Sequence, residues 1–165
     1  MIEVLVAMVV IAVGILGLTA LQLTAMKYNK EASLRSVATN LAIQVGDQMR
    51  SNRAGVKAGN YDRDMGYTAA LVAVAAPGCG VSTDCSAADM SKFDISIWQA
   101  NLTAALPGGA GAIIPSTTAD AKSIVVMWMD KSLNDAGATD PACTVSPNTN
   151  AAVVGVRCFN TMFTP

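Results

Sequence analysis

The residues of this chain that could support chemistry are four cysteines, one isolated glutamate and a scatter of aspartates. The 165-residue sequence contains no histidine, so it lacks the base of Ser-His-Asp and Cys-His nucleophilic sites and the commonest metal ligand. We therefore expect no catalytic residue, no metal site and no cofactor. The net charge of −1 gives no general reason to expect a nucleic acid as a partner.

The cysteines are Cys79, Cys85, Cys143 and Cys158, and no two of them form a C-x-x-C pair. They predict two disulfides in an oxidising compartment, and the alternative is four buried free thiols in a cytosolic protein. Of the three possible pairings we expect Cys79–Cys85 with Cys143–Cys158, because cysteines close in sequence meet with the least loop-closure entropy. A Cys143–Cys158 bridge would fasten a long loop to the last predicted strand.

Two motifs that suggest ligand sites are better explained structurally. The run Gly108–Gly111 follows a predicted helix, and no Lys-Ser/Thr pair comes after it, so it fits a turn better than a phosphate-binding loop. Asp130, Asp135 and Asp140 offer oxygen ligands, but they lack the spacing of a calcium-binding loop.

A cluster of basic residues lies near the expected end of the first long helix: Arg50, Arg53, Lys57 and Arg63. A solvated helix end is the better reading, because the negative end of a helix dipole attracts cations. Contact with DNA is the alternative.

The elements that would position these residues begin with an apolar run from Val4 to Leu23. As a helix, about twenty such residues span about 30 Å, the thickness of the hydrocarbon core of a membrane. A cleavable signal peptide would need a basic start, and a buried core helix would be shorter. We therefore predict a membrane-spanning helix over residues 1–24, in which Glu3 is the only charge and could reach the lipid headgroups from the helix end.

The charges after the apolar run conflict with the cysteines over topology. Lys27, Lys30 and Arg35 follow the run directly, and the positive-inside rule would keep them and the rest of the chain in the cytoplasm. Disulfides require the opposite side. The conflict is resolved if a basic leader once preceded Met1, which we state as an expectation.

The helical pattern continues beyond the apolar run, over residues 25–54. Its apolar residues recur at steps of three and four, which predicts an amphipathic helix whose apolar face docks on the remaining chain. This packing or partner face consists of Leu34, Val37, Leu41, Val45 and Met49. The segment Asn52–Gly55 is expected to end the helix at its glycine.

Residues 55–165 read as a small α+β globular domain. A shorter helix is expected to open at Ser91, with its buried stripe at Ile95, Trp98, Leu102 and Ala105. Strands are predicted at Gly111–Pro115, Ser123–Met129 and Ala151–Phe159, with a connecting segment over Tyr61–Ala76 and a long loop over Asn134–Asn150.

These features together resemble a type IV pilin. The stretch IEVLVAMVVIAVGILGL is similar to the start of that family, and this similarity would place the mature family start about two residues upstream of Met1. The stretches LQLTAMKYNKEASLRSVATNLAIQVGDQMRSNRAG, WQANLTAALPGGAG and IVVMWMD resemble the PilV group of minor pilins. Major subunits of the family often carry a helix-breaking proline after the apolar run. This chain has none, so Gly14 and Gly17 are the candidates for loosening the helix.

The resemblance implies a fold and a role. The fold is a long N-terminal α-helix packed on a small antiparallel β-sheet, with a disulfide-closed C-terminal region. In the filament Glu3 would face the N-terminal amine of a neighbouring subunit. The role would be structural and not enzymatic: a minor pilin in a tip-proximal complex that primes pilus assembly and supports adhesion or twitching motility.

The same resemblance implies partners and a location. The partners would be other minor pilins, the major pilin and a tip adhesin, with no small-molecule substrate and no nucleic acid. The chain would cross the bacterial inner membrane once, with its C-terminal domain in the periplasm, before entering the extracellular pilus. The alternatives are a minor pseudopilin of type II secretion and, in another class, a single-span periplasmic binding or sensor domain, which would need a pocket with convergent polar groups.

Overall fold

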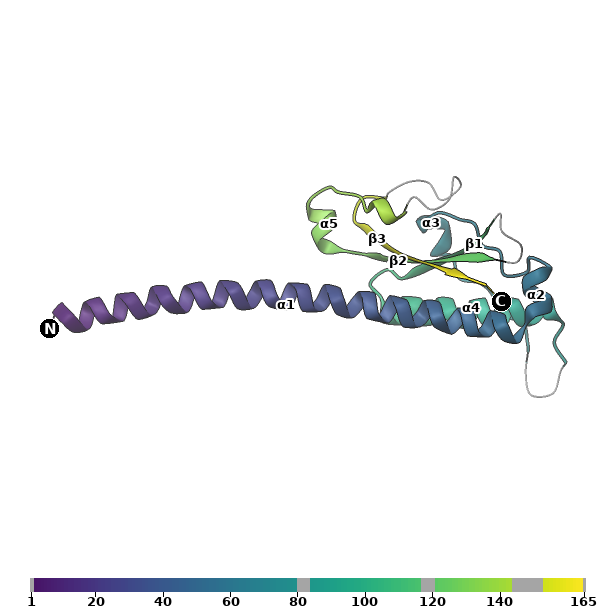
Figure 1. The fold of residues 1–165 in the computed structure, drawn as a ribbon, viewed down its shortest axis with the longest axis horizontal. Coiled ribbons are helices and arrows are strands. Elements are labelled where there is room, and N and C mark those ends of the chain that lie inside the picture. The colour runs from purple at the N-terminus through teal and green to yellow at the C-terminus, as the bar shows by residue number, and fades with distance from the viewer. Residues whose placement is uncertain (1, 80–83, 117–120, 144–152, 165) are drawn as a thin grey trace. The chain divides into compact units, whose positions relative to one another are not determined.

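The computed structural model describes residues 2–79, 84–116, 121–143 and 153–164. Its elements are α1 (Ile2–Ser51), α2 (Arg53–Lys57), α3 (Tyr67–Ala70), α4 (Ala87–Ala105), β1 (Ala110–Pro115), β2 (Lys122–Met129), α5 (Lys131–Asp135), the 3₁₀ turn η1 (Pro141–Cys143) and β3 (Val156–Phe163) (Figure 1). The chain divides into two compact units, residues 1–36 and residues 37–165.

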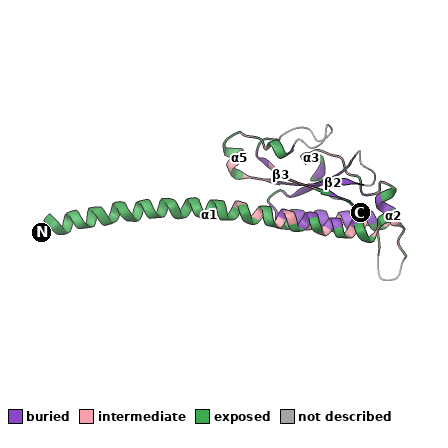
Figure 2. Ribbon diagram, viewed as in Figure 1, coloured by how far each residue is buried: buried purple, intermediate pink, exposed green. Residues whose placement is uncertain are grey.

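The first unit is the apolar part of α1. Its side chains are exposed over nearly the whole length (Figure 2), and it contains an 18-residue window of mean hydropathy 2.8 with none of the window buried. Its two threonines satisfy their hydroxyl groups within the helix: Thr19 donates to the Ile15 carbonyl at 2.8 Å and Thr24 to the Ala20 carbonyl at 3.0 Å. This back-bonding lets a polar side chain sit in an apolar environment without an unpaired donor.

The second unit is built on a three-stranded sheet of order β1-β2-β3, antiparallel throughout. The last turns of α1 and the helix α4 cover one face of this sheet (Figure 1). Trp98 on α4 fixes the two helices to each other, since its indole N–H donates to the Leu41 carbonyl at 2.9 Å. Gly46 lets α1 approach the sheet closely, because a Cβ at this position would lie 3.2 Å from the Phe163 ring. The predicted fold class is confirmed.

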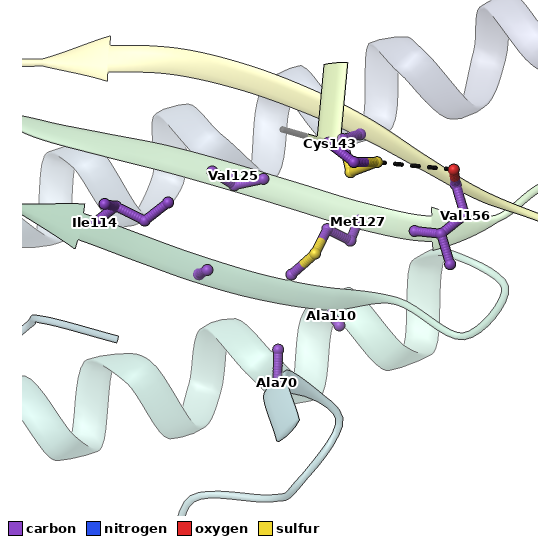
Figure 3. Packing of buried hydrophobic residues seen from close by; sticks show 9 residues of the cluster. Ala70, Ala110, Ile114, Val125, Met127, Cys143 and Val156 are labelled. Atoms are coloured by element: carbon purple, nitrogen blue, oxygen red, sulfur yellow. Dashed lines mark hydrogen bonds between the residues drawn. A yellow bond between two sulfur atoms is a disulfide. The ribbon is translucent and has the colours of Figure 1, made fainter. Parts of the chain in front are cut away.

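The other face of the sheet carries a second apolar cluster, shown in Figure 3. It brings together small and β-branched side chains from α3, the three strands and η1: Ala70, Ala110, Ala112, Ile114, Val125, Met127, Cys143, Val156 and Cys158. The Cys143–Cys158 disulfide lies within this cluster and closes the C-terminal region. The Cys143 sulfur is also 3.7 Å from the Val156 carbonyl oxygen, a contact that is no ordinary hydrogen bond because the disulfide leaves no thiol hydrogen.

A buried polar cluster joins the end of α1 to α4. The Tyr61 hydroxyl donates to the carboxylate of Asp94, and the Asn52 amide donates to the Tyr61 oxygen at 3.2 Å and to the Ala87 carbonyl at 2.8 Å. Burial raises the pKa of both Tyr61 and Asp94. Because each polar group has a partner, the cluster fixes one arrangement of the helices at little desolvation cost.

Several predicted boundaries were wrong. Gly55 does not end α1; the helix stops at Ser51, and Asn52 caps the short helix α2, which contains Gly55. The second long helix begins at Ala87 rather than Ser91, since the Ser86 hydroxyl accepts from the Asp89 amide at 3.1 Å as an N-cap. The buried stripe of α4 continues to Leu106, and Ala105 is exposed.

Further differences concern the segments between and after these helices. The connecting segment expected over Tyr61–Ala76 contains α3, and the long loop expected from Asn134 begins within α5 and includes η1. The last strand lies at Val156–Phe163 rather than Ala151–Phe159. The first two residues predicted for it, 151 and 152, lie outside the described residues, as does most of the predicted loop.

A buried ion pair between Asp130 and Arg157 makes the stability of this domain depend on pH. Arg157 Nε donates to Asp130 at 2.7 Å, and Asp130 also caps α5. Burial alone would raise the pKa of Asp130, but the hydrogen bonds from Ser132 and Arg157 outweigh it and lower the pKa to about 2. A lowered carboxyl pKa stabilises the fold above the pKa of the unfolded chain, about 4, and this contribution is lost as the pH falls towards about 2.

We expect Asp130→Asn to reduce the free energy of unfolding by about 2 kcal/mol at neutral pH, and the difference from the wild type to shrink as the pH approaches about 2. Asparagine keeps the helix cap and removes the charge. Denaturant unfolding of the full chain in detergent micelles measures both values. A difference that is the same at both pH values would show that the ion pair contributes nothing.

Candidate assembly surface

Glu3 lies in the first turn of α1, where it is exposed. At 100° per residue, the helix places Gly14 about 20° and Gly17 about 40° around the axis from Glu3, whereas Ala12 is about 180° away. The one charge of the apolar run therefore shares a face with both of its glycines. We call this face, Glu3 with Gly14 and Gly17, the glycine face.

Nothing within the chain explains the two glycines of this face. A Cβ added at Gly14 or at Gly17 would meet no atom within 4 Å. Glycine inside a helix costs roughly 1 kcal/mol relative to alanine, and no close packing in this chain compensates for it. Small residues are what allow two helix backbones to approach each other in an apolar environment. The arrangement can therefore pack a second helix closely, beside a carboxylate that needs a partner.

The amphipathic face predicted farther along α1 serves the chain itself. Leu41, Val45 and Met49 are buried within the second unit, and Leu34 and Val37 are partly buried. A partner cannot reach the three buried side chains without unfolding the domain. The part of α1 over residues 37–51 that remains exposed includes Ile43, at 54%.

The cysteines form two disulfides, Cys79–Cys85 and Cys143–Cys158. The first closes a short surface segment that follows the extended chain after α3. The second ties η1 to β3, so that the segment carrying η1 is held against the end of the sheet. Both bridges belong to the second unit.

The three aspartates considered as calcium ligands each have a structural role. Asp130 pairs with Arg157, and Asp135 with Lys131 at 2.9 Å. Asp140 accepts from the backbone amides of Ala142 at 2.9 Å and Cys158 at 3.2 Å. Among the described residues there is no group of three or more acidic, cysteine or histidine side chains that could hold a metal ion.

The basic residues near the end of α1 do not act as one patch. Arg50 pairs with Asp47 at 2.6 Å and lies over the Phe163 ring, 5.0 Å from its centroid. Arg63 is partly buried, and burial lowers its pKa. Arg53 and Lys57 remain exposed on α2. This division weakens the case for a nucleic-acid contact, which needs several free cations along one surface.

A shallow groove of about 470 Å³ lies between α4 and the extended segment after α3. The polar group best placed to bind a ligand there is the amide of Gln99, and it is already used. Its nitrogen donates to the carbonyls of Ala70 at 2.9 Å and Val72 at 2.6 Å, and its oxygen accepts from the Val74 amide at 3.1 Å. The groove therefore has an apolar lining without free convergent polar groups, which a small-molecule site requires.

Sequence reasoning missed the polar residues that fix the domain, namely Asn52, Tyr61, Asp94 and Gln99. One signal was readable: Ser86 followed three residues later by Asp89 is a helix-start motif, and it would have placed α4 correctly. The others carry no local signal, because their partners are far away in sequence.

Comparison with known proteins gives one match. Residues 20–96, just under half of the chain, match the model of a family described as Tt1218-like: Type IV pilin Tt1218. No curated protein and no solved structure matches the chain. The matched region runs from within the apolar helix to the middle of α4 and includes all of the α1 segment that packs on the sheet.

Proposed function

We propose that this chain, which the match over residues 20–96 assigns to the type IV pilin family, is a minor pilin of the PilV group. Pilins are structural proteins without enzymatic activity, and membership implies association with other pilins. In this role the chain joins other minor pilins in a tip-proximal complex that primes assembly, contacts the major pilin and supports a tip adhesin, adhesion and motility. The resemblance of its helix and its LPGGAG and IVVMWMD stretches to PilV supports the finer assignment.

The observation that carries this proposal is the glycine face of α1. Residues 1–24 would act as the membrane and filament-core half of the helix, residues 25–54 as its docked half, and residues 55–165 as the globular domain. An apolar helix that moves from lipid into a filament core never meets water, so the hydrophobic driving force changes little. Close packing at Gly14 and Gly17 and the pairing of Glu3 are then what select its neighbours.

The location follows from the same features. The apolar helix is consistent with a membrane or pilus location. Two disulfides favour an oxidising compartment for the second unit. We therefore place that unit in the periplasm before assembly, with α1 crossing the inner membrane once, and on the pilus afterwards.

The test is where the protein is found in cells that make pili. We expect the chain in filaments sheared from the cell surface, at low copy number beside the major subunit, and a marked loss of surface pili when the chain is deleted. Immunoblots of sheared and membrane fractions measure both. If the chain occurs in membranes only, and pilus number is unchanged without it, the proposal is wrong.

The alternatives predict different fractions. A type II secretion pseudopilin would be lost without affecting surface pili and would reduce protein secretion instead. A single-span binding or sensor domain would stay in the membrane, and its candidate pocket is the groove beside α4. That pocket is poorly suited, because the amide of Gln99 is consumed by the backbone of the neighbouring segment.

A further inference from the structure

The two outer strands of the sheet end in different ways. On β1, Arg63 pairs with Ile113 through two backbone hydrogen bonds of 2.8 and 3.1 Å, and Pro115 ends the strand without an N–H group. This edge is therefore closed, in the manner by which soluble proteins avoid the addition of a further strand.

The edge of β3 is closed over its first half only. The backbone amide of Val156 donates to the Val153 carbonyl at 3.1 Å, that of Cys158 donates to the Asp140 carboxylate, and the Asn160 side-chain amide donates to the Ala142 carbonyl. The disulfide-bonded segment around η1 thus covers β3 as far as Asn160.

The second half of this edge is open. Since the Cys158 amide points away from β2, the alternation of an antiparallel ladder turns the backbone groups of Asn160 and Met162 outward as well. Within the residues that the structure describes, these outward N–H and C=O groups make no backbone hydrogen bond. Met162 is 67% exposed, and no charged residue occurs from Cys158 to Thr164. An open, uncharged and partly apolar strand edge is a template for another strand.

A second copy of this chain is a poor occupant. Leu41 meets Trp98, which packs near Gly111, while Gly46 and Arg50 meet Phe163, so β3 runs in the same direction as the last part of α1. A copy paired antiparallel through the same edge would point its α1 the opposite way. Both helices could not then enter one membrane, an argument that rests on the proposed membrane anchoring.

We propose that the edge of β3 at residues 160–164 binds an extended segment of a different polypeptide by strand addition. Main-chain hydrogen bonds to Asn160 and Met162 hold the segment, and an uncharged side chain opposite Met162 completes the apolar contact. The segment at η1 sets the limit of this site, because it blocks the edge before Asn160.

The test uses the full chain in the membranes of a cell that produces pili. A benzophenone amino acid replaces Thr164, which lies one residue beyond β3, and irradiation captures whatever lies on the edge. Met162→Pro removes the outward N–H without touching the ladder to β2, whereas Met162→Thr keeps it. We expect an adduct with another polypeptide that maps to an uncharged extended segment, unchanged with Thr and reduced about tenfold with Pro.

The control is a benzophenone at Val72, an apolar residue with the same exposed fraction of 67% that is not on a strand edge. Thermal unfolding of Met162→Pro in micelles checks that the domain stays folded. An adduct no stronger than at Val72, equal adducts for the Pro and Thr variants, or an adduct with a second copy of this chain would each overturn the proposal. A captured partner that is no pilus protein would refute the minor-pilin role and leave strand addition standing.

Discussion

Glu3→Gln is expected to insert into the membrane as well as the wild type and to enter filaments about tenfold less. An ionised carboxylate in hydrocarbon costs about 2.5 kcal/mol or more, so the substitution eases insertion. In the filament the same carboxylate would be paired with a neighbour's cation, and leaving that cation buried alone costs about 3–5 kcal/mol. Immunoblots of sheared filaments, normalised to the membrane fraction, measure the ratio.

The matched control for this result is Glu3→Asp, which keeps the charge and shortens the side chain by one methylene. It should restore most of the incorporation. Gly17→Leu and Ala12→Leu separate the glycine face from the rest of the helix, because they add the same side chain on nearly opposite sides. Only the first should reduce incorporation. Entry of Glu3→Gln into filaments at the wild-type level would mean that Glu3 merely reaches the lipid headgroups.

The parts of the fold that were predictable from sequence are those fixed by local pattern. The apolar run and the three- and four-residue steps after it predicted α1 almost to its end. Runs of β-branched residues predicted β1 and β2 to within one residue. In these segments local propensity and burial point the same way.

The third strand was misplaced because its pattern is mixed. The apolar residues before it, including Val153 and Val154, attracted the assignment but are 38% and 46% exposed. The strand itself contains Arg157, Asn160 and Thr161, and its position is set by the ladder to β2. Register of this kind depends on a partner strand, which local pattern does not contain.

The candidate site divides in the same way. Glu3, Gly14 and Gly17 stand out in the sequence because they interrupt an apolar run. That the glycines have open space around them, and share a face with Glu3, requires the continuous helix of the structure. The open edge of β3 was beyond prediction altogether, since it depends on how far the segment at η1 reaches.

Gly109→Ala is expected to destabilise the second unit by about 3 kcal/mol or more, lowering its melting temperature by roughly 10 °C. Gly109 belongs to the turn between α4 and β1, where a Cβ would lie 2.0 Å from the Leu102 carbonyl oxygen and 3.1 Å from the Leu106 side chain. The nearer atom is backbone at the end of α4, so relief of the clash must displace the helix or the strand. The run Gly108–Gly111 is thus a close-packed turn.

The matched control is Gly78→Ala, because a Cβ there would meet nothing within 4 Å. The same change of one methyl group should alter stability by less than about 0.5 kcal/mol at this surface position. Thermal unfolding of both full-length variants in micelles, followed by circular dichroism, compares them directly. If Gly109→Ala melts with Gly78→Ala, the turn has room for a side chain, and the close packing of α4 against β1 does not explain the glycine.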